Sequence, residues 1–127
     1  MAEITISEDA EADLAIFVID GVISVDEMMA IPQDSPGFQM ARHLVDMTKA
    51  DFHLLDGSGL RRVAEVFAER GRGRPDARTA VLVSSDVDAT IVKLYTEITS
   101  DMTGGQVAFK VTSSRDEALA WLSEADA

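Results

Sequence analysis

The chain of 127 residues contains no cysteine. This absence excludes disulfides, thiolate catalysis and cysteine-based zinc or iron–sulfur sites. Basic residues are scarce, because 11 Lys and Arg stand against 23 Asp and Glu, for a net charge of −12. A surface with that charge repels phosphate backbones and anionic membranes at long range. We therefore expect no nucleic-acid partner.

Long hydrophobic runs are also missing. The longest uninterrupted apolar run, Leu14 to Ile19, has six residues, whereas a membrane-spanning helix needs about 20. The N-terminus carries acids where a secretion signal has basic residues, so we expect no membrane-spanning segment and a cytoplasmic location. The remaining composition, 46% hydrophobic and 27% charged with three prolines, is typical of a globular protein. We predict a single domain over residues 1–127.

Strand and helix patterns alternate along this chain. Residues 14–19 form an unbroken apolar strand that suggests cover on both faces, and the β-branched run 79–83 is typical of a parallel strand in the middle of a sheet. The predicted strands are residues 4–6, 14–19, 43–47, 79–83 and 107–111, and an acidic turn at 8–13 joins the first two into a hairpin. The predicted helices cover about 24–31, 60–71, 87–102 and 118–125.

Local signals set the ends and the buried faces of the helices. Capping boxes at residues 24–27 and 114–117 open the first and last helices, and residues 84–86 cap the third. The buried stripe expected on the second helix is Leu60, Val63, Ala64, Phe67 and Ala68; on the third it is Val87, Ile91, Leu94, Tyr95, Ile98 and Met102. The element order is β-β-α-β-α-β-α-β-α. It predicts an α/β fold with a mixed, mostly parallel sheet of about five strands and about four helices.

Two stretches of sequence connect this order to a known family. Residues 45–48 followed by Asp56-Gly57-Ser58-Gly59-Leu60 resemble the strand and helix start of STAS domains, which include the anti-sigma-factor antagonists. The segments 78–86, 94–95 and 116–122 look like the SpoIIAA-like, or STAS/SEC14-like, bacterial branch. The resemblance covers roughly residues 14 to 123. It implies a STAS-like fold and a non-enzymatic protein-interaction module without a cofactor.

The resemblance also implies a regulatory site at the start of the second helix. Ser58 matches the position that the anti-sigma antagonists phosphorylate, and Gly57 stands where they carry another serine. In that mechanism the unmodified surface docks on a kinase-type regulator, and a phosphate blocks docking by adding about two negative charges. Asp56, Ser58, Gly59, Arg61 and Arg62 would form the site. In the purely structural alternative, Asp56 or Ser58 is only the helix N-cap and the glycines permit the turn.

Basic residues gather around this helix, and the two histidines lie before it. Six of the eleven Lys and Arg residues lie within 18 positions: Arg61, Arg62, Arg70, Arg72, Arg74 and Arg78. They form either a basic zone that binds an anion or a partner, or a solvated helix end. His43 and His53 have acids nearby, but the sequence shows no complete metal-ligand set and no nucleophile, base and orienting group. We expect neither a metal site nor a catalytic site.

A second hypothesis concerns apolar side chains in the first half of the chain. Met28, Met29, Phe38, Met47 and Phe52, with Arg72 and Arg74 as an anionic headgroup site, would form a binding site for a small apolar or lipid ligand. The structural alternative is that the methionines fill the core. A third hypothesis is a homodimer that uses Phe38, Met40 and the edge strand at residues 4–6.

Overall fold

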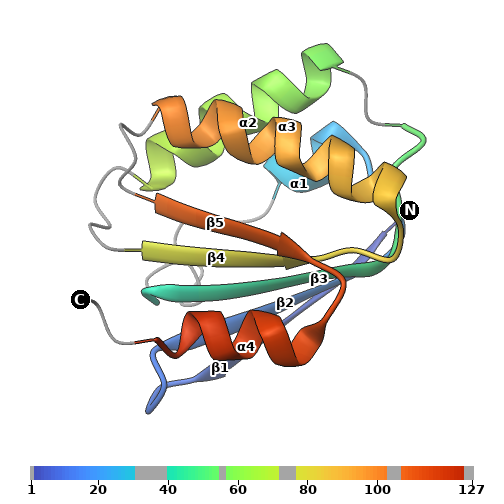
Figure 1. Ribbon diagram of the computed structural model, residues 1–127. Coiled ribbons are helices and arrows are strands. Elements are labelled where there is room, and N and C mark those ends of the chain that lie inside the picture. Colours follow the sequence, from blue (N-terminus) through green and yellow to red (C-terminus); the bar gives the residue numbers. More distant parts are fainter. Residues whose placement is uncertain (1, 31–39, 55–56, 72–76, 103–106, 125–127) are drawn as a thin grey trace.

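The computed structural model describes residues 2–30, 40–54, 57–71, 77–102 and 107–124 (Figure 1). The described elements follow the predicted order, which is confirmed. They are β1 (Glu3–Asp9), β2 (Leu14–Val22), α1 (Val25–Met29), β3 (Arg42–Asp51), α2 (Gly57–Gly71), β4 (Ala77–Leu82), α3 (Asp86–Met102), β5 (Val107–Thr112) and α4 (Arg115–Leu122).

The strands form a single mixed sheet. In the described part of the chain it has five strands in the order β1-β2-β3-β4-β5. β1 is antiparallel to β2, and the remaining neighbours are parallel. The prediction that the strand at 79–83 lies in the middle was wrong, because β3 occupies that place and β4 lies between β3 and β5. An apolar run predicts burial on both sides, which a strand can have at any interior position of the sheet and not only in the middle.

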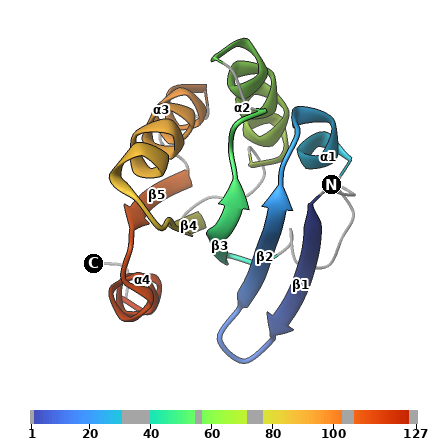
Figure 2. The same ribbon diagram turned by 90° about the vertical axis from the view of Figure 1, so that its right-hand side faces the viewer.

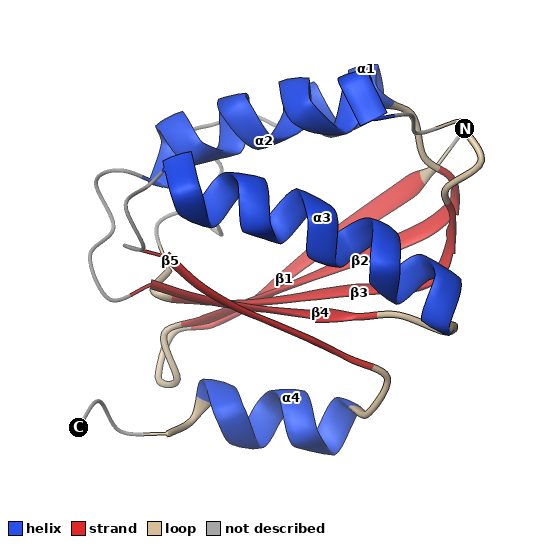
Figure 3. Cartoon of the chain, turned by 45° about the horizontal axis from the view of Figure 1, so that its top comes forward, coloured by secondary structure: helices blue, strands red, loops and turns tan. Residues whose placement is uncertain are grey.

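Helices cover both faces of this sheet. α1, α2 and α3 lie on one face, and α4 lies alone on the other (Figures 1 and 3). This arrangement follows from right-handed crossovers between parallel neighbours, which place successive helices on the same face. β5 is the last strand, so α4 is free to pack on the opposite face.

Alternating strand residues divide the core into two clusters. The cluster beneath α1–α3 consists of Ile19, Ile23, Met47, Phe52, Val81, Val83 and Val92; the cluster beneath α4 consists of Leu44, Ala80, Leu82, Ala118 and Leu122. On β2, Phe17 and Ile19 are buried, whereas Leu14 and Ile16 are half-buried against the α4 cluster. The cover predicted for both faces of this strand is therefore complete on one face only. Trp121 packs against the α4 cluster, as expected for the last helix.

The buried face of α3 differs from the predicted stripe. Val87 is 70% exposed and Leu94 is 48% exposed, so both predictions were wrong. The buried residues are Val92, Thr96 and Thr99. The two threonine hydroxyls donate to backbone carbonyls one turn back on the helix, which satisfies them inside the core. Helix periodicity shows an apolar arc, but it does not show that polar threonines can form the buried centre beside it.

Candidate functional site

Ser58 is the second residue of α2, because the helix begins at Gly57. Its side chain is exposed, and Gly59, the next residue, is buried. A residue inside the first turn is not the N-cap, which precedes the first helical residue. This placement argues against Ser58 as the N-cap of α2. Asp56, the other capping candidate, lies outside the described residues.

Arg61 and Arg62 extend the surface from Ser58 along the first turns of α2. Arg61 Nε lies 3.5 Å from Glu65 Oε1, and both side chains are more than half exposed. Arg62 Nη2 donates to the Sδ atom of Met29 at 3.9 Å, so the end of α1 lies against the start of α2. We call Ser58, Arg61, Arg62 and Met29 the α2 surface.

The electrostatics of the α2 surface favour an anion at Ser58. The first turn of α2 carries no acidic side chain, and the positive end of the helix dipole lies at the helix start, where it favours negative charge. Arg61 and Arg62 stand three and four residues after Ser58, which are the spacings at which helix side chains meet. A phosphate on Ser58 is thus within reach of two guanidinium groups. One is that of Arg61, which pairs with Glu65, and the other is that of Arg62, which contacts Met29.

The two histidines occupy separate parts of β3 and its end. His43 is buried, and its ring meets the edge of Phe17 at 5.2 Å between centroids. His53 is exposed beyond the strand, where its Nδ1 lies 2.9 Å from Asp51 Oδ1. The backbone N–H and the ring of His53 lower the pKa of the Asp51 carboxyl. Within the described ranges, His, Asp and Glu side chains form no group of three that could hold a metal ion.

The methionine and phenylalanine residues of the second hypothesis lie largely in the core. Met47 is 5% exposed and Phe52 is 6% exposed, and both belong to the cluster beneath α1–α3. Met28 packs against the same cluster, while Met29 contributes to the α2 surface. The remaining proposed ligand residues, Phe38, Arg72 and Arg74, lie outside the described residues.

Two arginines fasten the end of α4 to the sheet. Arg42 Nε donates to the carbonyl of Leu122 at 3.0 Å. Arg78 Nη1 donates to the carbonyls of Trp121 at 3.0 Å and Glu124 at 2.8 Å, and its guanidinium lies 5.6 Å from the centroid of the Trp121 ring. Cations are favoured at a helix C-terminus, where carbonyls lack helical partners. Arg78 therefore serves α4 on the face opposite α2, and the predicted basic zone is not one surface.

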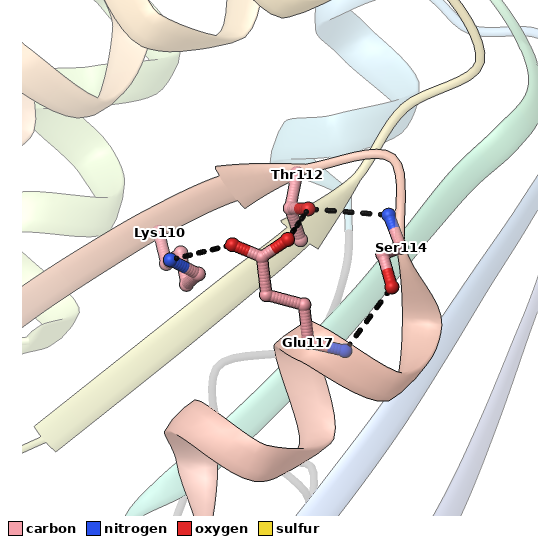
Figure 4. Close-up of polar contacts among 4 residues, drawn as sticks. All are labelled: Lys110, Thr112, Ser114 and Glu117. Carbon is pink, nitrogen blue, oxygen red and sulfur yellow. Dashed lines mark hydrogen bonds and ion pairs between the residues drawn. The ribbon is translucent and has the colours of Figure 1, made fainter.

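A polar cluster holds the start of α4 (Figure 4). Ser114 Oγ accepts from the N–H of Glu117 at 3.2 Å, which confirms half of the predicted capping box. The Glu117 carboxylate accepts from Thr112 Oγ1 and pairs with Lys110 Nζ, both at 3.1 Å, instead of returning to Ser114. Thr112 Oγ1 accepts from the Ser114 N–H at 3.1 Å. The Lys110 ammonium and the Thr112 hydroxyl lower the pKa of Glu117.

An ion pair joins α4 to β3. Arg115 Nη1 lies 3.5 Å from Asp46 Oδ2, and the Asp46 side chain is 18% exposed. Burial raises the pKa of Asp46, but hydrogen bonds from the Thr48 hydroxyl and N–H, together with Arg115, lower it more. The net pKa is below the usual value for aspartate. No short-range sequence pattern indicated this contact, because its partners are 69 residues apart.

A groove of about 380 Å³ runs between α4 and the N-terminal hairpin. Its walls are mostly apolar, and Arg42 is the charged residue in them. The lining residues are Ala12, Leu14, Arg42, Leu119, Ala120, Leu122 and Ser123. None of these belongs to the methionine and phenylalanine set, so sequence reasoning did not identify this groove.

Comparison with known proteins identifies the fold. No protein-family model matches the chain, and no curated protein matches its sequence. In structure the chain is similar to an uncharacterized protein of the DUF3478 family from Shewanella loihica PV-4, whose crystal structure is described as having a SpoIIAA-like fold. The TM-score is 0.57 with 19% identity, over 95% of this chain and 93% of that chain. The chain therefore has a SpoIIAA-like fold, as the sequence predicted. Among the described residues, no helix is both long enough and apolar enough to cross a membrane.

Proposed function

We propose that this protein is a non-enzymatic protein-interaction module in which the α2 surface is a regulatory switch. The unmodified surface docks on a partner protein of the kinase-type regulator class, as in anti-sigma-factor antagonists. Phosphorylation of Ser58 adds about two negative charges at the contact and prevents docking. The observation that supports this proposal is the exposed Ser58 hydroxyl in the first turn of a 15-residue helix, on a SpoIIAA-like fold.

The arrangement around Ser58 explains how a single phosphate would change the surface. Arg61 at present pairs with Glu65, and Arg62 contacts Met29 on α1. A phosphate on Ser58 competes for both guanidinium groups, because charge-assisted bonds to phosphate are stronger than a contact with a thioether. Modification therefore alters both the net charge of the α2 surface and the positions of two side chains that a partner would contact.

The test compares partner binding by the wild type and by two aspartate variants. Protein is cross-linked in its own cells, and the partner captured by the wild type is identified and purified. Binding of that partner to Ser58→Asp should be at least about tenfold weaker, a loss of about 1.4 kcal/mol. The matched control is Ser113→Asp, which adds the same charge at an exposed serine just before α4. Equal binding by the wild type and Ser58→Asp would refute the switch.

The alternative function, binding of a small apolar or lipid ligand, has weaker support. Met47 and Phe52 are packed in the core, so a ligand at that site would have to displace them. The groove between α4 and the hairpin is a second place for such a ligand, and Arg42 is the charged residue in its walls. Native mass spectrometry of protein from its own cells separates the two functions, because a retained lipid-sized adduct on an unmodified chain favours ligand binding.

A further inference from the structure

β1 forms an open border of the sheet. It pairs with β2 along its whole length, from Glu3 opposite Asp20 to Asp9 opposite Leu14, and it lies outermost in Figure 2. Within the described ranges no strand pairs with its other side, and six of its seven residues are exposed. Such an edge presents a row of backbone N–H and C=O groups to an incoming strand.

The opposite border of the sheet is better protected. β5 is flanked by α3 on one face and α4 on the other (Figures 1 and 3). It carries Lys110, and a lysine on an edge strand discourages further strand pairing. α4 packs on β3, β4 and β5, so the hairpin of β1 and β2 extends beyond the cover that α4 provides (Figure 2).

The open border is strongly acidic. Residues 1–22 contain six carboxylates and no Lys or Arg, and the first basic residue of the chain is Arg42. All six carboxylates are exposed; they are Glu3, Glu8, Asp9, Glu11, Asp13 and Asp20. Charge of a single sign attracts a partner of opposite sign and repels one of the same sign.

We propose that β1 accepts an extended basic segment of a partner protein as an additional antiparallel strand. Main-chain hydrogen bonds along the open edge supply affinity, and the side chains that alternate along β1 supply specificity. This surface is separate from the α2 surface, so the proposal does not depend on phosphorylation of Ser58.

The charges on β1 also argue against a second copy of this chain as the occupant. The antiparallel register that pairs all seven residues of two copies centres on Ile6 and places Glu3 opposite Asp9 twice. Like charges directly opposite each other on neighbouring strands are destabilising. A shift by two residues removes these direct pairs, but it shortens the ladder from seven residues to five, and each copy still brings the six exposed carboxylates of residues 1–22 to the shared edge. The acids therefore disfavour self-pairing at this edge and leave it available to a basic strand.

The order of side chains on β1 defines the complementary sequence. Basic residues belong opposite Asp9, Glu8 and Glu3, and apolar β-branched residues belong opposite Ile6, which is 36% exposed, and Ile4. Read antiparallel to β1, this pattern is Lys-Lys-Thr-Val-Thr-Val-Lys. Its threonines lie opposite Thr5 and Ser7, where polar cross-strand pairs form.

The probe is this heptapeptide with blocked ends, titrated into the full-length protein at low salt. Backbone amide NMR shifts and hydrogen exchange locate the binding site. A peptide with prolines in place of the central valine and the threonine that follows it has the same charge but cannot complete the ladder, because one of two adjacent residues directs its N–H toward β1. The triple variant Glu3→Gln, Glu8→Gln, Asp9→Asn removes the edge charges. The control triple Glu97→Gln, Asp101→Asn, Asp116→Asn removes as much charge from exposed sites elsewhere.

The expected result is binding that protects the amides of residues 3–9. Binding should weaken about tenfold in the edge triple variant and about tenfold with the proline peptide, and it should be retained in the control triple variant and in Ser58→Asp. Three results would overturn the proposal: no binding at millimolar peptide, equal loss in the two triple variants, or a protein dimer formed through β1. If the peptide binds β1 as expected but the wild type and Ser58→Asp bind the captured partner equally, the proposed switch is refuted and the β1 proposal stands.

Discussion

Replacing Ser58 by aspartate should stabilise the protein slightly. A carboxylate in the first turn of α2 gains about 0.3–1 kcal/mol from the helix dipole. Pairs with Arg61 and Arg62 at the i+3 and i+4 positions add about 0.2–0.5 kcal/mol each. Losing the exposed ion pair between Arg61 and Glu65, at 3.5 Å, costs about 0.3–0.5 kcal/mol of stability. The net expectation is a gain of about 0.5–1.5 kcal/mol at low ionic strength.

Urea denaturation at neutral pH measures this difference. The gain should fall toward zero in about 1 M salt, where exposed charges are screened within about 3 Å. Ser58→Ala is the companion variant, and because Ser58 lies inside the helix, it should change the free energy of unfolding by less than about 0.5 kcal/mol. A loss of about 1 kcal/mol or more in Ser58→Ala would show that Ser58 caps α2. Destabilisation by Ser58→Asp would contradict the electrostatic reasoning for the α2 surface.

Three further predictions concern the core and the attachment of α4. Arg78→Met should cost about 2 kcal/mol in urea denaturation, because it removes two carbonyl hydrogen bonds and the contact with Trp121; an unchanged midpoint would show that Arg78 does not hold the helix. Folding lowers the pKa of Asp46, so its carboxylate should add to the free energy of unfolding above about pH 4, and this contribution should be lost as the pH falls through the folded pKa. If the wild type instead became more stable relative to Asp46→Asn as the pH fell, the prediction would have the wrong sign. Val92→Ala should cost about 2 kcal/mol and Val87→Ala less than about 0.5, and the reverse ranking would show that α3 buries the face containing Val87.

Much of the fold could be predicted because its signals are local. Apolar runs, turn residues and serine caps identify the elements in order, and Ser114 caps α4 as predicted, although Glu117 does not complete the capping box. Strand order was harder to read, since β3 and β4 are both interior strands. The face of α3 was misread because Val87 and Leu94 share a helical spacing with residues that are partly buried.

In the candidate site, as in the fold, the local arrangement could be predicted and the long-range contacts could not. Ser58, Arg61 and Arg62 are within one turn of each other in sequence, so their common surface follows from the helix alone. The contact between Arg62 and Met29 requires α1 and α2 to pack together. The bonds from Arg78 to the end of α4 span more than 40 residues. Such contacts depend on strand order and on the face each helix covers, and local patterns do not contain that information.

A switch on the α2 surface requires that Ser58 is phosphorylated in the cell. Intact-mass spectrometry with peptide mapping, on protein purified from its own cells, tests it most directly. We expect a fraction of the chain to be heavier by about 80 Da, with the added phosphate mapped to Ser58. A chain with no added mass under every growth condition sampled, or a phosphate that maps only to other residues, would contradict it.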